Sequence, residues 1–172
     1  MRDYVTEKGA AAFGTRLRRI SERLDRDVRE LYRLHGHDFE PSWFPVFVAL
    51  AEEGPMSVGD LAERMRISHA AVSQIRGKLT RARLVVARAD VADHRRQLLQ
   101  LTARGRALAE RLAPLWAAIA RTTDAICRAH APRLLQELDA LETALDESSL
   151  LERVAPKRRA RPRSKEKIHV VS

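Results

Sequence analysis

Two serines, Ser57 and Ser68, stand eleven residues apart, and each comes directly before a short segment with apolar side chains at helical spacing. A serine in this position accepts a hydrogen bond from the free N–H groups of the first helical turn, so both serines predict helix starts. Asp60, three residues after Ser57, makes the first start a variant of the capping box. The pattern predicts two short helices joined by a tight turn at residues 66–67, the second running to about Ala82.

Two short β-prone runs follow this helix pair. Residues 84–88 and 97–101 are rich in leucine and valine, and the polar link between them contains aspartates. Thr102 directly follows the second run and predicts the start of another helix. Two short helices, a tight turn and a hairpin in this order predict a winged helix-turn-helix.

Long amphipathic helices are predicted on both sides of this motif. Apolar residues recur every three or four positions over residues 13–34, again after Thr102, and in a last helix that opens at Pro132; residues 42–52 predict a further helix. The fold class expected is mainly α, with a small β-hairpin wing and long N- and C-terminal helices. Leucine-rich stripes this long exceed what one small winged domain covers, so a homodimer is expected.

The expected domain organisation follows from these elements and from a shift in composition near the end of the chain. The regions expected are a helical dimerisation region at 10–36 and 103–152, a winged DNA-binding domain at 41–102, and a disordered basic tail at 155–172. The tail has two interpretations, weak non-specific contact with DNA phosphates or simple solubilisation.

Positive charge is concentrated in two places. The net charge is +9, and residues 64–106 alone hold eleven lysines and arginines against two acids, while residues 153–172 hold eight against one. The segments at 1–63 and 107–152 are both net acidic. A local basic field within a folded domain predicts a polyanion ligand, and double-stranded DNA is the partner expected.

Other classes of protein are disfavoured by what the sequence lacks. It has no apolar run long enough for a membrane span and no secretory signal in its polar first ten residues, so a cytoplasmic protein is expected. Phosphate-binding loops, paired metal ligands and nucleophile motifs are also missing, so neither an enzyme nor a cofactor is expected. The single cysteine, Cys127, is interpreted as a buried structural residue rather than a redox sensor.

The second short helix carries the predicted base-reading face. The apolar residues of this helix line one side of it. The opposite side carries small and polar residues, which suits contact with the major groove. Gln74 matches the donor and acceptor of an adenine edge, and Ser73 matches several base edges. Gly77 is explained either by close approach of the backbone to DNA or by poor local packing. The predicted base contacts are Ser68, His69, Ala70, Ser73, Gln74 and Gly77.

Basic side chains around this face predict phosphate contacts, and those of the hairpin tip predict minor-groove contacts. The alternative is a solvated basic face without a ligand. The predicted phosphate contacts are Arg64, Arg66, Lys78, Arg81 and Arg88. The predicted wing contacts are Asp93, His94, Arg95 and Arg96.

Over about residues 10–152, these motifs in this order resemble the MarR family of bacterial regulators. The resemblance implies a dimer built from the first and last helices, with Arg95 in the minor groove and Asp93 bracing it. Two positions depart from the family pattern. Arg83 replaces a glycine at the end of the second short helix, so that end is expected to be strained or shaped differently. His94 replaces a basic residue. The matching stretches are Pro55 to Arg64, Ile67-Ser68, Val72-Ser73-Gln74, Asp93-His94-Arg95 and Leu101-Thr102-Ala103-Arg104-Gly105.

A possible effector pocket lies near the end of the first long helix, where the resemblance implies binding of small aromatic molecules. The alternative is that the aromatic residues there simply form the core. A metal site is disfavoured, because two histidines separated by one glycine are a poor ligand set. The residues expected to line the pocket are Tyr32, His35, His37, Trp43, Phe44 and Phe47.

Two functions of different kinds remain open. One is a sequence-specific regulator, expected to be a repressor that a small aromatic effector releases from a pseudo-palindromic operator. The other is an architectural protein that coats DNA with little sequence discrimination. Comparing the affinities for random and promoter DNA at matched salt separates them.

Overall fold

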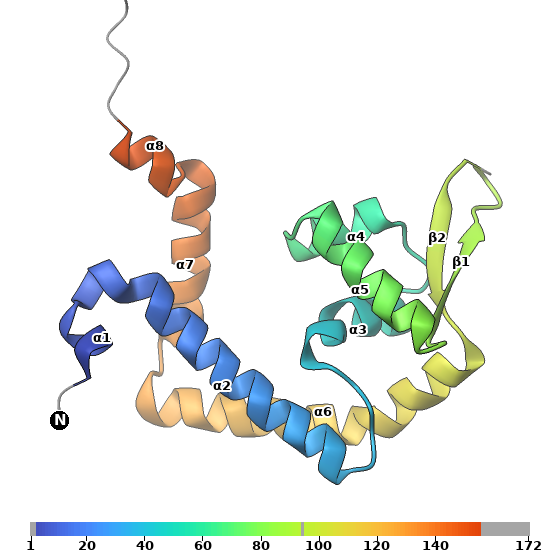
Figure 1. The fold of residues 1–172 in the computed structure, drawn as a ribbon, viewed down its shortest axis with the longest axis horizontal. Helices are drawn as coiled ribbons and strands as arrows, with labels where there is room; N and C mark the ends of the chain where they lie inside the picture. Colours follow the sequence, from blue (N-terminus) through green and yellow to red (C-terminus); the bar gives the residue numbers. More distant parts are fainter. Residues whose placement is uncertain (1–2, 94, 156–172) are drawn as a thin grey trace, which may run out of the picture. The chain divides into compact units, whose positions relative to one another are not determined.

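The computed structural model describes residues 3–93 and 95–155, so His94 and the predicted basic tail from residue 156 onward lie outside the described residues. The chain divides into two units, with the boundary between Arg121 and Thr122. Figure 1 shows the fold, which is mostly helical with one two-stranded hairpin, as the sequence predicts.

The first unit carries the winged helix-turn-helix. Its elements are α1 (Tyr4–Glu7), η1 (Gly9–Ala12), α2 (Phe13–Leu34), η2 (Pro41–Trp43), α3 (Phe44–Glu52), α4 (Val58–Met65), α5 (His69–Arg81), β1 (Val85–Ala89), β2 (Gln97–Leu101) and the larger part of α6 (Ala103–His130). The second unit contains the end of α6, then α7 (Leu134–Glu147) and α8 (Leu150–Val154).

The capping residues predicted from the sequence begin the helices as expected. Ser57 and Asp60 form a complete capping box at the start of α4, and the Ser68 hydroxyl accepts a hydrogen bond from the Ala71 N–H at the start of α5. Thr102 Oγ1 accepts a hydrogen bond from the Gly105 N–H at 3.0 Å at the start of α6. These caps fix where the elements of the motif begin.

The structure corrects the expected boundaries in three places. The helix expected over 42–52 starts with a 3₁₀ turn, Pro41–Trp43, before α3. The last long helix begins at Leu134 rather than at Pro132, which lies in the preceding turn. A second capping box, formed by Ser149 and Glu152, starts the additional short helix α8.

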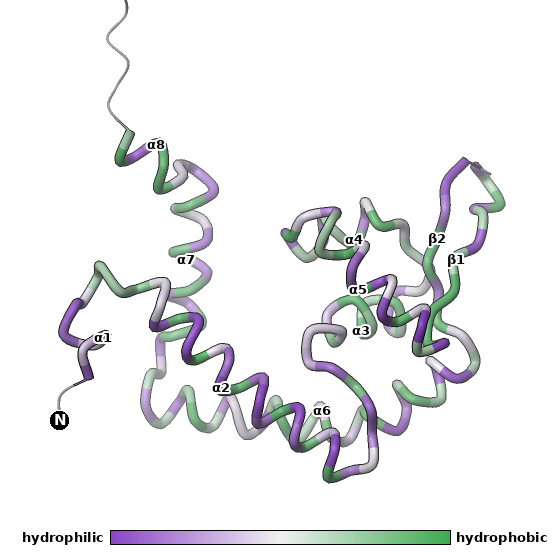
Figure 2. Tube along the Cα trace, in the orientation of Figure 1, coloured by the Kyte–Doolittle hydropathy of each residue, from purple (hydrophilic) through white to green (hydrophobic). Residues whose placement is uncertain are grey.

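One apolar core holds the first unit together. Figure 2 shows that α3 is largely hydrophobic and α2 largely hydrophilic along its length. The fully buried side chains come from most elements of the motif, so each element is anchored to the same centre. These residues are Tyr32, Val46, Phe47, Leu61, Val72, Leu79, Val85, Leu99 and Leu112.

The linker before α4 adds a third extended segment to the hairpin. β1 and β2 pair antiparallel from Val85 opposite Leu101 to Ala89 opposite Gln97. Met56 forms an isolated bridge with Leu99, and the two residues exchange backbone hydrogen bonds of 3.1 and 2.8 Å. This bridge joins the hairpin to the start of the helix-turn-helix, and it was not predicted from the sequence.

The end of α5 takes the left-handed turn that normally favours glycine. Arg83 has a φ of +58°. The Arg83 N–H donates to the Thr80 carbonyl and the Leu84 N–H donates to the Leu79 carbonyl, which together form a Schellman motif. A side chain in this conformation is strained, so the sequence-based expectation of strain at this position agrees with the observed backbone.

The start of α6 packs directly against the residue before β1. The Leu84 carbonyl accepts the Thr102 N–H at 3.0 Å. A Cβ atom added to Gly105 would lie 2.2 Å from the Leu84 oxygen, far inside van der Waals contact. Glycine is therefore required here by packing between two stretches of backbone.

We expect Gly105→Ala to lower the free energy of unfolding by about 1–3 kcal/mol, because the new methyl group overpacks a site whose nearest atom is backbone. Gly77→Ala is the matched control, since a Cβ there meets nothing within 4 Å. That control is expected to raise stability by up to about 1 kcal/mol through helix propensity. Urea unfolding measures both, and equal stabilities for Gly105→Ala and the wild type would contradict the packing described.

Candidate nucleic-acid interface

Helix α5 presents the predicted base-reading face away from the core. Ser68, His69, Ala70 and Gln74 are exposed, whereas Ser73 and Gly77 are half-buried. The opposite side of the helix is anchored by the buried Val72 and Leu79. Five of the six predicted residues thus lie at the N-cap and in the first half of α5, with Gly77 one turn further along, on the side of the helix away from its buried residues.

Two details refine the predicted roles on this face. The Ser68 hydroxyl caps the helix, which leaves only its second lone pair and its proton for other contacts. No atom lies within 4 Å of a Cβ built on Gly77, so packing within the protein does not require glycine there. The open space is compatible with close approach of another molecule to the α5 backbone.

The predicted phosphate contacts have different surroundings. Lys78 and Arg81, near the end of α5, and Arg88 on β1 are exposed. Arg64 forms an exposed ion pair with Glu53. Arg66 ends α4 in the left-handed conformation, with a φ of +54°. Exposed ion pairs contribute only about 0–1 kcal/mol, so the pair with Glu53 does not prevent Arg64 from turning to a phosphate.

Hydrogen bonds within the hairpin tip shape the wing. Asp93 accepts the Arg95 N–H on its carboxylate at 3.0 Å and the Arg96 N–H on its carbonyl at 2.8 Å. The Asp90 carboxylate accepts the Ala92 N–H at 2.9 Å. Asp93 therefore braces the backbone that carries the exposed Arg95 side chain. His94, the remaining predicted tip residue, lies outside the described residues.

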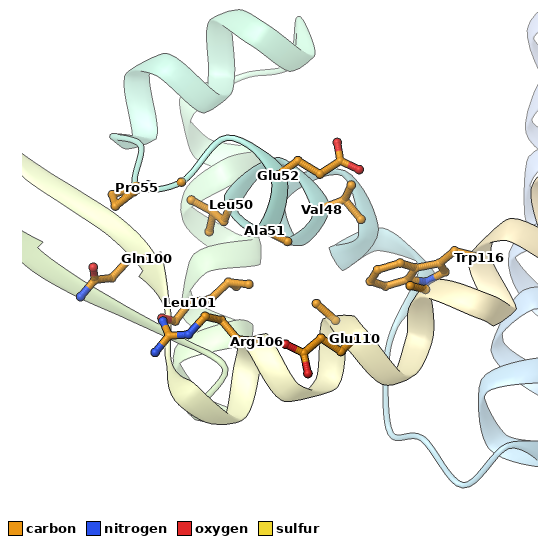
Figure 3. Close-up of a pocket in the computed structure, with 13 residues that line it drawn as sticks. Val48, Leu50, Ala51, Glu52, Pro55, Gln100, Leu101, Arg106, Glu110 and Trp116 are labelled. Atoms are coloured by element: carbon orange, nitrogen blue, oxygen red, sulfur yellow. The ribbon is translucent and has the colours of Figure 1, made fainter.

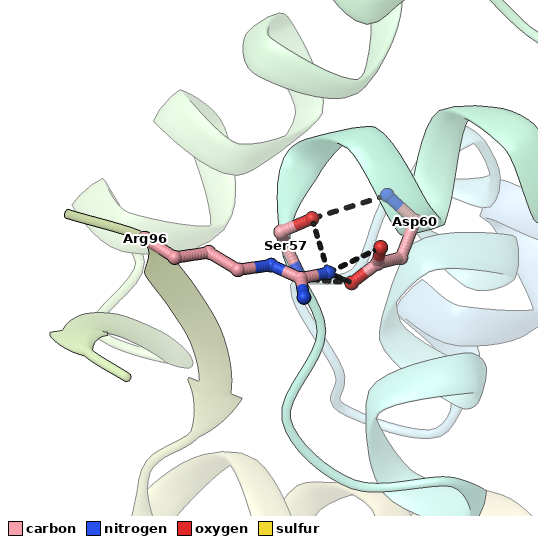
Figure 4. A network of polar contacts seen from close by, with 3 residues as sticks. All are labelled: Ser57, Asp60 and Arg96. Atoms are coloured by element: carbon pink, nitrogen blue, oxygen red, sulfur yellow. Dashed lines mark hydrogen bonds and ion pairs between the residues drawn. The ribbon is translucent and has the colours of Figure 1, made fainter. Parts of the chain in front are cut away.

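The Arg96 side chain points away from the wing tip, which differs from its predicted role in the minor groove. Its Nη2 atom donates to both carboxylate oxygens of Asp60 at 2.5 Å and approaches the Ser57 hydroxyl at 3.4 Å (Figure 4). The partners lie 36 residues apart in sequence, so local pattern does not reveal the pair. Of the two adjacent wing arginines, Arg95 is exposed, whereas Arg96 is paired with a side chain of the same protein.

The Asp60 carboxylate is held ionised by its surroundings. Hydrogen bonds from Ser57, chiefly from its backbone N–H, lower the pKa of Asp60, and the neighbouring Arg96 guanidinium lowers it further. The site therefore combines a helix cap and an ion pair on one side chain.

The residues expected to form an effector pocket are mostly part of the core. Tyr32, Trp43 and Phe47 are buried and pack edge-to-face around Phe39. The Tyr32 hydroxyl accepts a hydrogen bond from Trp116 Nε1 at 2.9 Å, and burial raises the pKa of this phenol. The position of these three residues agrees with the alternative interpretation, in which the aromatic residues form the core.

The other three predicted pocket residues lie at the surface. Phe44 is 38% exposed and packs edge-to-face on Trp116. His35 is exposed, with its ring nitrogen 2.8 Å from the Leu31 carbonyl oxygen. His37 is half-buried and lines two small hollows, of about 430 and 280 Å³. The six residues do not surround one common cavity among those the structure describes.

A larger hollow, of about 600 Å³, opens between α3, β2 and α6 (Figure 3). Its walls are mainly apolar and end at Trp116, and its polar side chains include Arg106 and Glu110 from α6. Arg106 is fixed by a 2.8 Å hydrogen bond to the Leu101 carbonyl. Sequence reasoning missed this hollow, because its lining comes from three separate segments whose apolar residues look like ordinary core positions.

Among residues 3–93 and 95–155, no three histidine, cysteine, aspartate or glutamate side chains come together in a group that could hold a metal ion. Within the same residues, no helix combines the length and the apolar character that crossing a membrane requires.

Comparisons with known proteins agree on one family. A model described as MarR family matches residues 37–96. A solved MarR-family regulator from Neisseria meningitidis is 26% identical with a TM-score of 0.55, and the match covers 78% of this chain and 92% of that one. BpsR from Bordetella bronchiseptica, whose structure concerns regulation of its DNA binding by 6-hydroxynicotinic acid, is 27% identical with a TM-score of 0.59, over 73% and 91%.

MepR from S. aureus, solved in complex with DNA, shares the fold at 19% identity and a TM-score of 0.61, with 78% of this chain and 97% of that chain covered. A comparison with the curated proteins found no match. The element order and the solved structures together define a winged helix-turn-helix protein of the transcriptional-regulator class. Its residues 37–96 match the MarR family model, and the chain has the fold of MarR-family transcriptional regulators.

The lowered pKa of Asp60 predicts a pH dependence of stability. Because this pKa is lower in the folded protein than in the unfolded chain, the ionised carboxylate stabilises the fold above the ordinary carboxyl pKa, and the contribution is lost as the pH falls through the folded-state value. We expect Asp60→Asn to lose less unfolding free energy than the wild type between about pH 5 and pH 2. Urea unfolding across this range tests it, and Glu63→Gln, on the same helix, should behave like the wild type.

Proposed function

We propose that the protein is a sequence-specific DNA-binding transcriptional regulator without catalytic activity of its own, acting as a repressor that binds a pseudo-palindromic operator as a homodimer. The observation that carries the proposal is the outward face of α5. Its polar residues are accessible at the capped start of the helix, and they lie in the segment with the strongest positive charge. A helix with these properties is suited to the major groove.

The wing supports the same proposal. Arg95 is exposed on a tip whose backbone is ordered by Asp93. A guanidinium at such a tip is attracted to the negative potential of a narrow minor groove. Arg64, Lys78, Arg81 and Arg88 then contact phosphates, which adds affinity without sequence preference. MepR, solved in complex with DNA, shares this fold.

We expect Gln74→Ala to weaken binding to the protein's own promoter by about 1–3 kcal/mol and to relax preference at one base pair, because a bidentate contact with adenine is lost. Binding to random DNA should change little. Thr80→Ala, exposed near the C-terminal end of the same helix and not among the predicted base contacts, is the control. Fluorescence anisotropy at fixed salt measures both affinities, and equal weakening on all DNA would contradict the placement of α5.

The competing function, a protein that coats DNA regardless of sequence, predicts another result in the same assay. Wild-type affinity for promoter and random fragments should then be equal at matched salt. A regulator instead binds its operator at least about a thousandfold more tightly than random DNA. Footprinting on its own promoter locates the operator and tests whether its two half-sites are separated by a whole number of helical turns.

Dimerisation is inferred from apolar side chains that the described chain leaves uncovered. On α2, Phe13, Leu17, Ile20 and Leu24 follow one helical stripe, and each is at least 40% exposed. In the second unit, α7 and α8 also carry exposed leucines, among them Leu135 and Leu151. Stripes of this kind are normally buried against another surface, and a second copy of the chain supplies it here.

We expect Ile20→Glu to convert the dimer to a monomer at micromolar concentration, because it places a charge in the proposed apolar interface. Ser21→Glu, exposed at the neighbouring position of α2, should leave the dimer intact. Sedimentation equilibrium measures the mass of each variant. A wild type that remains monomeric at all concentrations would overturn this part of the proposal.

We further propose that a small aromatic effector releases the protein from DNA. BpsR, at 27% identity, is described as a protein whose DNA binding 6-hydroxynicotinic acid regulates. The hollow between α3, β2 and α6 has apolar walls, the Trp116 ring and the Arg106 guanidinium, which suit an aromatic acid. Its position beside β2 gives a bound molecule a route to influence the wing.

We expect Ala113→Phe, which fills this hollow, to abolish the response to an effector while leaving promoter binding within about twofold of the wild type, since the new side chain occupies the ligand volume. The measurement is release of a promoter fragment during titration with 6-hydroxynicotinic acid and related aromatic acids. Release that persists in the variant would place the effector elsewhere.

A further inference from the structure

The outer half of the hairpin has little apolar attachment to the rest of the unit. On β1 only Val85 is buried, and Ala87, Arg88 and Ala89 are exposed. On β2 the buried residues are Leu99 and Leu101, while Gln97 is exposed. The backbone bridge between Met56 and Leu99 lies at the same level as the last buried residue. Beyond Leu99, Leu98 is half-buried and Gln97 and Arg96 are exposed, so polar contacts become important for the orientation of the wing.

The contact between Arg96 and Asp60 lies beyond this level, toward the tip. The Arg96 carbonyl accepts the Asp90 N–H at 2.9 Å, just beyond the last strand pair, Ala89 and Gln97. The Arg96 side chain reaches Asp60 and Ser57 at the start of α4. Among the described residues, Arg96 is the wing residue nearest the tip with a side-chain hydrogen bond to a different element.

We propose that Arg96 is a positioning residue, which fastens the wing to the first helix of the helix-turn-helix and so orients Arg95 for the minor groove. The proposal rests on the proposed DNA-binding function. The Arg96 guanidinium binds the Asp60 carboxylate, as Figure 4 shows. That carboxylate is already held in place by the Ser57 N–H, as part of the cap of α4. The wing is thereby ordered before DNA arrives, which reduces the entropy lost on binding.

Removing the negative charge of Asp60 distinguishes a positioning role of Arg96 from a direct contact between Arg96 and a phosphate. A carboxylate near the DNA repels phosphates, so on electrostatics alone its removal should leave binding unchanged or tighten it. If Asp60 instead positions the wing through Arg96, its removal weakens binding although the protein becomes more positive. The two interpretations predict opposite signs for one substitution.

The test compares promoter binding by the wild type, Asp60→Asn, Arg96→Ala and the double variant at matched salt. We expect each single variant to bind about two- to fivefold more weakly, the range by which exposed ion pairs shift an equilibrium, and the double variant to bind no more weakly than Arg96→Ala. Asparagine still accepts the Ser57 N–H, so the cap survives. Glu63→Gln, also on α4, removes the same charge without touching the pair and should bind at least as tightly as the wild type.

A second measurement needs no DNA, so it decides the proposal even if promoter binding fails. Hydrogen exchange of the Arg95 and Arg96 amides should be about two- to fivefold faster in Arg96→Ala and Asp60→Asn than in the wild type, because the wing opens more readily. The Asp60 amide, which donates to Ser57, should keep its protection in Arg96→Ala. Unchanged wing exchange, or promoter binding by Asp60→Asn as tight as by Glu63→Gln, would overturn the positioning role.

Failure of the proposed function gives a different result. A wild-type protein that does not distinguish promoter from random DNA contradicts the regulator proposal, while faster wing exchange in the two variants would still support the fastening of the wing by Arg96.

Discussion

The carbonyl group of Leu84 lies where three elements of the motif meet. The turn that ends α5 leads into this residue, β1 starts immediately after it, and the start of α6 packs on its oxygen through Thr102 and Gly105. A single backbone group thus fixes the end of α5 relative to both the hairpin and α6. Because all atoms involved are main chain or a short side chain, the junction has little freedom to relax.

The helix starts could be predicted from the sequence because their physical cause is local. Ser57, Ser68 and Thr102 each accept a hydrogen bond from an N–H three residues on, so one short stretch contains both cause and effect. The expectation at Arg83 came instead from the resemblance to a family in which a glycine usually stands at this position. The bridge from Met56 to Leu99 could not be predicted, because its partners are brought together only by the folded core.

In the candidate site, too, the features with a local cause could be predicted from the sequence, and those that depend on distant contacts could not. The reading face of α5 follows from helical periodicity, and the structure leaves those residues accessible. The roles of the two wing arginines do not follow from local pattern, because Arg95 and Arg96 are chemically identical neighbours. Only the position of Asp60, set by the fold, distinguishes them. The aromatic residues were ambiguous in a different way, since a core and an aromatic pocket require the same side chains.

The left-handed arginine at the end of α5 has a consequence for how this helix behaves in motion. A non-glycine residue held in this region costs roughly 1–2 kcal/mol, so fraying of the last turn recovers energy that a glycine would not release. The Schellman hydrogen bonds and the junction at Leu84 hold the last turn of α5 closed against this cost. If that junction were loosened, the last turn of α5 would open before its serine-capped start.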